Sequence, residues 1–388
     1  MKKILHLMHD DKFLDMAYRE FERCAPRQSL YAIQGKKTQL KYIKNFQPQF
    51  CTQSEIINIC KSTEISSVVF HSLGQYAPLI RHIPKEKKIV WLGWGYDYYD
   101  RLLQGFYPQG LTLPRTRDLS GKIAAEKCLL ERLRNKTPLD IAQAIKRKAS
   151  AWLNTPEGSE QKSLDRIDYF IPVLETEYEM ARHQNPWLKA RYIPWNYGTV
   201  EDDFICDGSL NCIGDNILIG NSAAPENNHL EIFSFIKNRF DISNKTIFCP
   251  LSYGNPRYAQ VIADAGRKYF GKNFTPLMEF MESQEYIKLL SSCGYVFMNH
   301  LRQQALGNIC ILMMAGAKIY LNPNSPLCLW LNQRGAHIET INEDNNYIQY
   351  LSSLTESEKE KNRNIIYSHW NRKSQLRKTM ELVNAITC

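Results

Sequence analysis

The stretch that decides the fold is Glu279–Asn308, EFMESQEYIKLLSSCGYVFMNHLRQQALGN. Apolar residues recur at helical spacing from Phe280 to Leu290, and the run Gly294–Met298 predicts a short buried strand. A polar loop then leads into an apolar helix predicted at Ile309–Ala315. A helix, a buried strand, a loop and a second helix in this order are typical of an α/β fold with a parallel sheet.

The loop after this strand is unusually rich in groups that bind anions. It contains Arg302, Gln303, Gln304, Gly307 and Asn308. At the carboxyl end of a strand and the amino end of a helix, free backbone N–H groups and the helix dipole favour negative charge, and an arginine adds a bidentate donor. We therefore expect a nucleotide diphosphate here, because an arginine and two glutamines in a loop favour ligand contact over packing.

The same alternation of strands and helices extends through the rest of the chain. It predicts strands at Lys3–Met8, Ser66–Phe70, Lys88–Leu92, Tyr169–Val173, Ala190–Ile193, Asn216–Ile219, Lys245–Cys249 and Lys318–Leu321. A loop at Val200–Gly214 separates two such halves. The expected fold is α/β, with two Rossmann-like doubly wound domains facing a central cleft. We place the domains at residues 1–205 and 212–370, followed by a C-terminal helix at 371–388.

The 388-residue chain has a formal net charge of +9, and much of it is concentrated in residues 111–154. Between Leu111 and Leu153, ten basic residues are offset by four acidic ones, and two helices are expected there, broken near Thr137 and Pro138. No nucleic-acid motif accompanies this charge, so nucleic acid is not expected as a partner. An anionic membrane surface and a solvated helical hairpin remain as alternatives.

Several classes of protein are disfavoured by what the sequence lacks. No apolar stretch approaches the roughly 18 residues that span a bilayer, and the amino-terminal apolar run is too short for a signal peptide. The eleven cysteines are scattered without a C-x-x-C pair, which indicates buried thiols rather than a zinc site. There is also no P-loop, no G-x-G-x-x-G and no D-x-D. We expect a site that uses neither a metal nor a cofactor.

Other strand ends of the second half offer further ligand groups. Asn221 and Ser222 follow one strand, and Tyr253 follows the next. The turn at Ser222 suits either a phosphate or a helix cap. Glutamates 279, 282 and 285 recur at a spacing of three, which usually marks a wet helix face, so only Glu282 is a candidate for binding ribose or sugar hydroxyls.

Titratable side chains lie at or just past strand ends in the first half. They are His6, Asp11, His71 and Asp97. Any of them can act as a general base, and each alone can equally be a satisfied structural polar group. Asp97 lies within the aromatic stretch Trp91–Tyr99, whose rings can stack on a sugar or pack as core.

Taken in order, these stretches resemble the TDP-4-acetamido-4,6-dideoxygalactose (Fuc4NAc) lipid II transferases of enterobacterial common antigen synthesis, a 4-alpha-L-fucosyltransferase family. The matching residues are His6, Asp11, Phe70-His71, Trp91-x-x-Trp94-Gly95-x-Asp97, Ile219-Gly220-Asn221-Ser222, Asn227, His229, Glu282, Tyr286, Leu289-Leu290, Arg302-Gln303-Gln304-x-x-Gly307 and Ala315-Gly316. The chain departs from the family pattern mainly in Leu111–Asn154, which is longer and more basic.

The resemblance implies a GT-B glycosyltransferase that acts at the cytoplasmic face of the inner membrane as a peripheral protein. The implied donor is a dTDP-sugar bound by the C-terminal domain, and the implied acceptor is an undecaprenyl-diphosphate-linked glycan bound by the N-terminal domain. Arg302, Asn221, Ser222 and the amino end of the helix at Asn308 are expected to stabilise the departing diphosphate. Alternatives are another nucleotide sugar or acceptor, an epimerase or hydrolase, or a non-catalytic scaffold that binds glycan or lipid.

Overall fold

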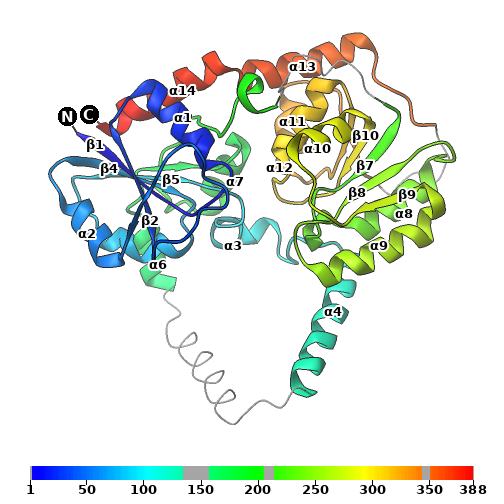
Figure 1. Ribbon diagram of the computed structural model, residues 1–388, viewed down its shortest axis with the longest axis horizontal. Coiled ribbons are helices and arrows are strands. Elements are labelled where there is room, and N and C mark those ends of the chain that lie inside the picture. The colour runs from blue at the N-terminus through cyan, green and yellow to red at the C-terminus, as the bar shows by residue number, and fades with distance from the viewer. Residues whose placement is uncertain (1, 134–156, 205–213, 343–349, 388) are drawn as a thin grey trace.

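The computed structural model describes residues 2–133, 157–204, 214–342 and 350–387, and all structural statements below refer to these residues. It contains two six-stranded sheets side by side, each with helices packed on both faces (Figure 1). All recorded strand pairs are parallel. The predicted fold, two Rossmann-like domains, is therefore confirmed.

The first sheet has the order β3-β2-β1-β4-β5-β6. Its strands are β1 Lys3–Met8, β2 Ser29–Gln34, β3 Gln49–Cys51, β4 Ile65–His71, β5 Lys88–Leu92 and β6 Tyr169–Ile171. The central strands are apolar almost throughout, because both faces of the sheet are covered. Along β1, for example, Ile4 belongs to the core on one face, and Leu5 and Leu7 belong to the core on the other.

The second sheet has the order β12-β11-β10-β7-β8-β9. Its strands are β7 Asn216–Ile219, β8 Ile247–Pro250, β9 Phe274–Leu277, β10 Cys293–Met298, β11 Lys318–Leu321 and β12 Glu339–Thr340. In the central strand β10, Tyr295 and Phe297 pack on one face, and Val296 and Met298 on the other. The strand predicted at Gly294–Met298 is therefore the middle of this sheet, and it directs the loop of Arg302 out of its carboxyl end.

Helices cover both sheets and connect the domains. Those of the first half are α1 Leu14–Cys24, α2 Gln53–Lys61, α3 Tyr99–Leu102, α4 Pro114–Leu133, α6 Glu157–Leu164 and α7 Glu175–Gln184. Those of the second half are α8 His229–Arg239, α9 Pro256–Phe270, α10 Ser283–Ser291, α11 Leu306–Ala315, α12 Pro326–Gln333, α13 Glu356–Trp370 and α14 Arg372–Thr387. Short 3₁₀ turns lie at Gly74–His82, Gln104–Phe106, Pro225–Asn227 and Gly271–Asn273, and a π turn lies at Val200–Phe204.

Two predicted elements differ from the structure. Residues 190–193 form no strand, because only Arg191 bridges to Tyr169 before Pro194 follows. Phe280 does not lie in a helix, since α10 begins at Ser283, and the Phe280 ring is 81% exposed. The break expected near Thr137 lies outside the described residues.

The start of α4 packs on the second domain, although the sequence places this segment in the first. Thr116 donates from its backbone N–H and its hydroxyl to the carboxylate of Glu231 in α8, at 3.0 and 2.5 Å. Ile123 is buried in the core of the second domain. The start of α4 thus packs on the C-terminal domain through apolar side chains. The rest of α4 extends away from that domain (Figure 1).

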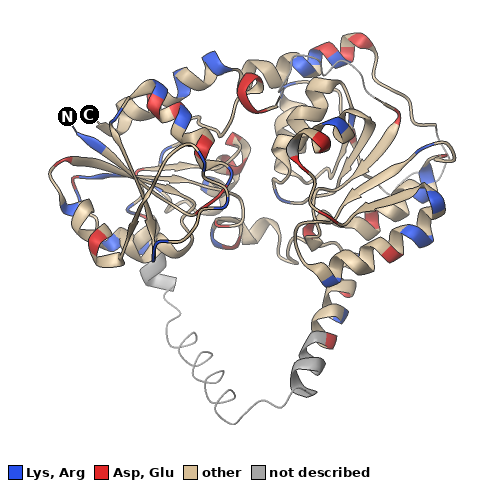
Figure 2. Ribbon diagram, in the orientation of Figure 1, with Lys and Arg blue, Asp and Glu red and all other residues tan. Residues whose placement is uncertain are grey.

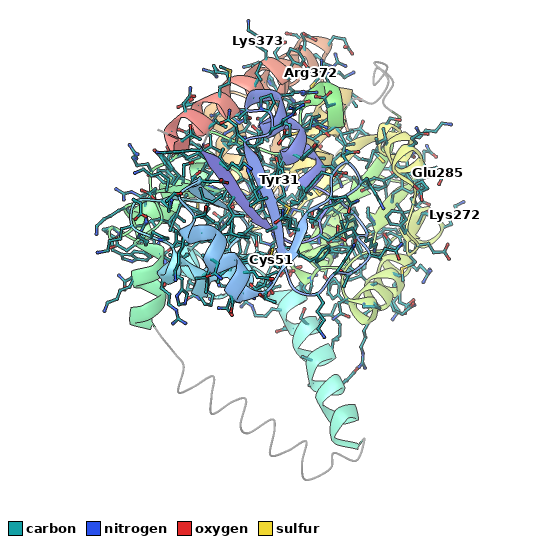
Figure 3. The ribbon with its side chains drawn as sticks, turned by 60° about the vertical axis from the view of Figure 1, so that its left-hand side comes forward. Tyr31, Cys51, Lys272, Glu285, Arg372 and Lys373 are labelled. Atoms are coloured by element: carbon teal, nitrogen blue, oxygen red, sulfur yellow. The ribbon has the colours of Figure 1, made fainter. Side chains whose placement is uncertain are left out.

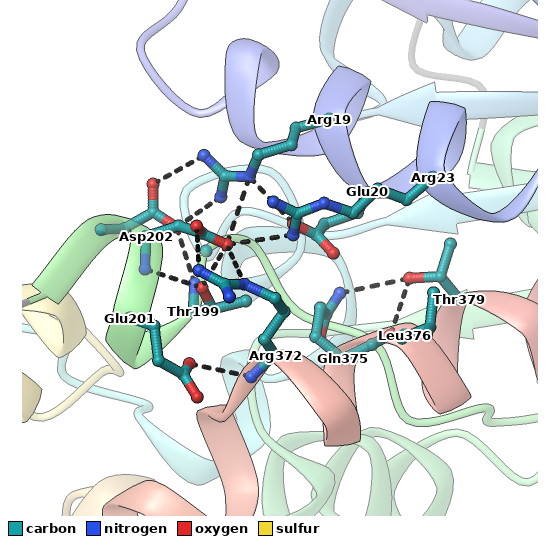
Figure 4. A network of polar contacts seen from close by, with 12 residues as sticks. Arg19, Glu20, Arg23, Thr199, Glu201, Asp202, Arg372, Gln375, Leu376 and Thr379 are labelled. Atoms are coloured by element: carbon teal, nitrogen blue, oxygen red, sulfur yellow. Dashed lines mark hydrogen bonds and ion pairs between the residues drawn. The ribbon is translucent and has the colours of Figure 1, made fainter. Parts of the chain in front are cut away.

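The C-terminal helices return the chain to the first domain. Helix α13 packs on α11, whereas α14 packs on α1, and its Leu382, Val383 and Ile386 complete the core of the N-terminal domain. Asp202, in the π turn after the first domain, lies among Arg19, Arg23 and Arg372 (Figure 4). The π turn at Val200–Phe204 and helix α14 are therefore both anchored to α1. No helix in the described part of the chain is long and apolar enough to cross a membrane.

Candidate active site between the two domains

The loop after β10 lies at the contact between the domains. Ala305 takes a left-handed conformation with φ of 60°, and α11 begins at the next residue. Gly307 is exposed, and a side chain there would meet only the ring of Phe204, at 4.0 Å. Asn308 donates to the hydroxyl of Tyr286 in α10 at 3.0 Å, which fixes the orientation of this first turn. Among the described residues, Gly307 at the amino end of α11 is therefore exposed.

The Arg302 guanidinium lies in the loop after β10, where its charge acts on the buried carboxylate of Glu177. The guanidinium is half-buried, and among the described residues no carboxylate forms an ion pair with it; the recorded contact is a 3.4 Å hydrogen bond to the carbonyl of Gln303. Gly95 is close to the same nitrogen, because a Cβ at this position would be 3.3 Å from Nη1. Since Gly95 follows β5, the carboxyl ends of the two sheets meet at this arginine.

The two glutamines that follow Arg302 have different surroundings. Gln303 is buried, and its backbone N–H donates to the hydroxyl of Tyr99 in the N-terminal domain at 2.9 Å. Gln304 donates from Nε2 to Oδ1 of Asn221 at 2.8 Å, while its Oε1 is buried without a partner among the described residues. The structure thus brings the predicted residues Gln304 and Asn221 together, with one amide oxygen left to accept a hydrogen bond.

The turn that carries Asn221 and Ser222 is built around Asn227. Its Oδ1 accepts from the backbone N–H of Asn221 at 2.9 Å, and its Nδ2 donates to the carbonyl and hydroxyl oxygens of Ser222 at 3.0 and 3.2 Å. His300, at the start of the arginine loop, contacts the same Oδ1 at 2.8 Å. Ser222 is therefore held inside the turn, and it does not cap α8, whose first residue is His229.

Gly220, which precedes Asn221, has a φ of 64° and almost no space for a side chain. A Cβ there would lie 2.7 Å from Oδ1 of Asn227 and 2.9 Å from Nε2 of His229. Both histidines of this region, His229 and His300, are buried, and burial lowers the pKa of each well below its usual value, to about 3 for His229. Neutral imidazoles thus line the inner side of the turn.

Tyr253 lies beside this turn, whereas Glu282 lies just before α10. Ala223 donates to the carbonyl of Tyr253 at 2.6 Å and accepts from the N–H of Asn255 at 3.1 Å, so the two loops are joined through their backbones. The Tyr253 side chain is 77% exposed. Glu282 precedes α10 and is also exposed, and Glu285 points to solvent (Figure 3). Exposed Tyr253 and Phe280 follow the neighbouring strands β8 and β9, and the position of Phe280 was missed.

In the N-terminal domain, His6 and His71 form a buried pair. Nδ1 of His6 lies 3.0 Å from Nε2 of His71, and Nδ1 of His71 lies 2.8 Å from the hydroxyl of Tyr197. Trp94 donates to the same hydroxyl at 2.7 Å. Burial lowers the pKa of His6 well below its usual value and that of His71 to about 3. The pair is neutral and enclosed behind Tyr197, and neither side chain is exposed to solvent.

Asp97 organises the aromatic loop from within. Its carboxylate accepts from the indole of Trp91 at 2.7 Å and from the backbone N–H groups of Leu73 and Trp94 at 2.7 and 2.8 Å. The side chain is buried, and desolvation raises its pKa although these hydrogen bonds oppose the rise. Three donors on a buried carboxylate tie the ends of β4 and β5 together.

Asp11 is the half-buried carboxylate of this edge. Oδ1 accepts from the N–H of Phe13 at 3.1 Å, and burial raises the pKa of the carboxyl group. Its charge raises the pKa of His9, although burial of that imidazole has the larger effect and lowers it. His9 was missed because a single histidine after a strand has no distinctive spacing.

Ser72 and Tyr96 also follow the ends of β4 and β5. Neither was predicted from the sequence as a site residue. Their hydroxyls lie 2.6 Å apart. A Cβ at Gly74 would lie 3.4 Å from Oγ of Ser72 and 3.5 Å from Nε2 of His9. Ser72 has a φ of 68°, a conformation that only the three-dimensional structure reveals. Among the described residues, no group of three His, Cys, Asp or Glu side chains is placed to hold a metal ion.

Known proteins resemble this chain in part of its sequence and in its fold. Residues 206–354 match the sequence model of the family described as 4-alpha-L-fucosyltransferase glycosyl transferase group 56. This range contains the turn of Asn221 and the loop of Arg302, and the match confirms the family resemblance predicted from the sequence.

Solved structures with the same fold include three from bacteria. A glycosyltransferase from Rickettsia africae has 10% identity and a TM-score of 0.61, over 99% of this chain and 98% of that one. Sucrose-phosphate synthase from Thermosynechococcus elongatus has 9% identity and a TM-score of 0.59, over 99% of each chain. HepE from Anabaena, in complex with UDP and glucose, has 10% identity and a TM-score of 0.54, over 100% of this chain and 96% of that one. At this identity the three show the fold.

Proposed function

We propose that this glycosyltransferase transfers a deoxy-acetamido sugar such as Fuc4NAc from a dTDP-sugar to an undecaprenyl-diphosphate-linked saccharide. The match of residues 206–354 to group 56 supports this proposal. The observation that carries the proposal is the Arg302 guanidinium. It lies beside the amino end of α11 and forms no ion pair with a described carboxylate. A diphosphate would form such an ion pair.

On the donor side, the leaving diphosphate is proposed to lie between the Asn221–Ser222 turn and the amino end of α11. Arg302, the backbone N–H groups around Gly307 and the helix dipole would stabilise the charge that develops as the bond to the anomeric carbon breaks. The Oε1 of Gln304, which is buried without a partner among the described residues, would accept from a sugar or ribose hydroxyl. Exposed Tyr253 and Glu282 are proposed to contact the nucleoside.

On the acceptor side, Asp11 is proposed as the general base. Of the four titratable residues predicted at this edge, it is the one that is partly exposed and not enclosed by three donors. It would take the proton from the acceptor hydroxyl while the oxygen forms the new bond to the anomeric carbon. Its raised pKa suits a base that must also release the proton. Asp97, His71 and His6 would instead hold the loops that shape the acceptor site.

The lipid-linked acceptor is proposed to bring the protein to the cytoplasmic face of the inner membrane. The described part of α4 carries both signs of charge (Figure 2), with Arg115 and Lys122 exposed. Most of the basic residues counted in this segment lie beyond the described side chains. Each basic group near an anionic bilayer contributes about 1 kcal/mol, so a cluster of them is sufficient for peripheral binding.

The proposal is tested by thermal stabilisation of the purified chain with dTDP, UDP, GDP and CDP. A ligand at a hundred times its dissociation constant adds roughly 2.7 kcal/mol, and we expect this for dTDP selectively. Arg302→Ala should weaken dTDP binding by about tenfold or more, because a hydrogen bond to a charged group contributes about 1.5–3 kcal/mol. Arg267→Ala, which changes an arginine on the exposed face of α9, is the control.

Two outcomes would oppose this function. If no nucleotide stabilises the protein, the chain is better explained as a glycan- or lipid-binding scaffold. If dTDP binds and the sugar is released to water at the same rate with and without a lipid-linked acceptor, the enzyme is a hydrolase. Selective response to another nucleotide would retain the transferase and replace the donor.

A further inference from the structure

One side chain of the N-terminal domain is hydrogen-bonded to the backbone of the Arg302 loop. The Tyr99 hydroxyl accepts from the N–H of Gln303 at 2.9 Å and donates to Oε1 of Glu177 at 2.7 Å. The other oxygen of Glu177 accepts from the N–H of Leu174 at 3.0 Å, which fixes the carboxylate at the start of α7. Gln303, Tyr99 and Glu177 are 6, 3 and 0% exposed. All three residues that form this chain of hydrogen bonds are therefore buried.

The position of this chain matters because Gln303 directly follows Arg302. A loop whose backbone N–H is fixed has less freedom in the preceding residue. Close to the same arginine lies Gly95, whose missing side chain and φ of 85° let the guanidinium approach the backbone of the aromatic loop. Residues 95 and 99 of one domain therefore both lie against the Arg302–Gln303 segment of the other.

We propose that Tyr99, held by Glu177, is a positioning residue for Arg302, so that binding of a nucleoside diphosphate by the C-terminal domain depends on contact with the N-terminal loop at residues 93–99. This inference rests on the proposed function, in which Arg302 binds the diphosphate.

A double-mutant cycle separates this role from general support of the fold. Titration calorimetry with dTDP is performed on the full chain as wild type, Tyr99→Phe, Arg302→Ala and the double variant. Phenylalanine retains the ring and removes only the hydroxyl between Gln303 and Glu177. We expect Tyr99→Phe to weaken dTDP binding about tenfold when Arg302 is present, and to have no further effect in the Arg302→Ala background.

Tyr107→Phe is the matched control. Tyr107 also belongs to the N-terminal domain, its ring stacks on Tyr99 at 5.8 Å, and its hydroxyl donates across the domain contact to the carbonyl of Asn324 at 3.4 Å. It does not contact the arginine loop through a recorded hydrogen bond. Its loss should leave the affinity for dTDP within about twofold of wild type. Glu177→Gln, which keeps an acceptor for Tyr99, should stay closer to wild type than Glu177→Ala.

The outcomes distinguish the inference from the function on which it rests. If Arg302→Ala weakens dTDP binding while Tyr99→Phe binds like wild type, or weakens binding equally in both arginine backgrounds, the positioning role is refuted and the proposed function stands. If wild-type protein binds no nucleotide, or Arg302→Ala binds it as well as wild type, the proposed donor site is refuted and the inference fails with it.

Discussion

Gly220→Ala tests the turn that presents Asn221 and Ser222. An added Cβ would lie 2.7 Å from Oδ1 of Asn227 and 2.9 Å from Nε2 of His229, at a φ of 64°. Left-handed backbone costs a residue other than glycine about 1 kcal/mol. Overpacking of a well-filled site costs about 1–3 kcal/mol more. The free energy of unfolding should therefore fall by about 2–4 kcal/mol.

Gly110→Ala provides the control for this substitution. Gly110 has a φ of 80°, but no described atom lies within 4 Å of the position that its Cβ would take. The control variant therefore has a positive-φ cost of about 1 kcal/mol without the collision. Urea unfolding followed by tryptophan fluorescence measures both variants, and calorimetry measures their affinity for dTDP.

The two variants are compared by their free energy of unfolding and their affinity for dTDP. We expect Gly220→Ala to be less stable than Gly110→Ala by about 1–3 kcal/mol. It should also bind dTDP about tenfold more weakly, because the displaced Asn227 no longer fixes the N–H of Asn221. Equal stability of the two variants, together with wild-type dTDP affinity for Gly220→Ala, would refute both the packing argument and the part that this turn plays in donor binding.

Three further predictions concern the buried carboxylates Asp97 and Glu177 and the ion pairs of Asp202. Asp97→Asn keeps the volume of the side chain but turns an N–H₂ group toward N–H donors. In urea denaturation it should therefore lower the free energy of unfolding by about 1–3 kcal/mol. Asp100→Asn, which changes an exposed carboxylate, is the control and should leave this free energy unchanged. Burial raises the pKa of Glu177 from 4.5 to about 7, so between these two pH values the folded state holds a proton that the unfolded state has released. The free energy of unfolding of the wild type, measured relative to that of Glu177→Gln, should therefore fall by about 1.4 kcal/mol for each pH unit between pH 4.5 and 7. Above pH 7 it should not change further. Asp202→Asn should lower the melting temperature by an amount that shrinks in molar salt, because the ion pairs with Arg19, Arg23 and Arg372 are partly exposed and therefore screened.

The second sheet was largely predictable because its central strands are apolar on both faces. The apolar run Gly294–Met298 predicted a buried strand, and β10 confirms it. The residues after this strand were therefore expected at the carboxyl end of the sheet. The edge strand β9 was missed, since Pro276 disfavours a strand and is tolerated there only because β9 has a neighbour on one side. Phe280 was misplaced because helical spacing of apolar residues continues past the start of α10 at Ser283.

The candidate site was predictable as a set of loops but not as a set of contacts. Arg302, Gln304 and Asn221 were expected from residue type and position, and the structure places the last two within 2.8 Å. The burial of His6 and His71 depends on Tyr197, more than a hundred residues away, so no local pattern could reveal it. The contact of Tyr99 with the arginine loop has the same cause, because it exists only once the two domains meet.

The central claim is that this glycosyltransferase moves a deoxy-acetamido sugar from dTDP to a lipid-linked glycan. The most direct measurement is release of dTDP from a dTDP-deoxy-acetamido sugar, with and without an undecaprenyl-diphosphate-linked saccharide, by wild type and by Arg302→Ala. We predict release that requires the acceptor, with formation of an extended lipid-linked glycan, and its loss in the variant. Release at the same rate without acceptor, or full activity in Arg302→Ala, would contradict the account.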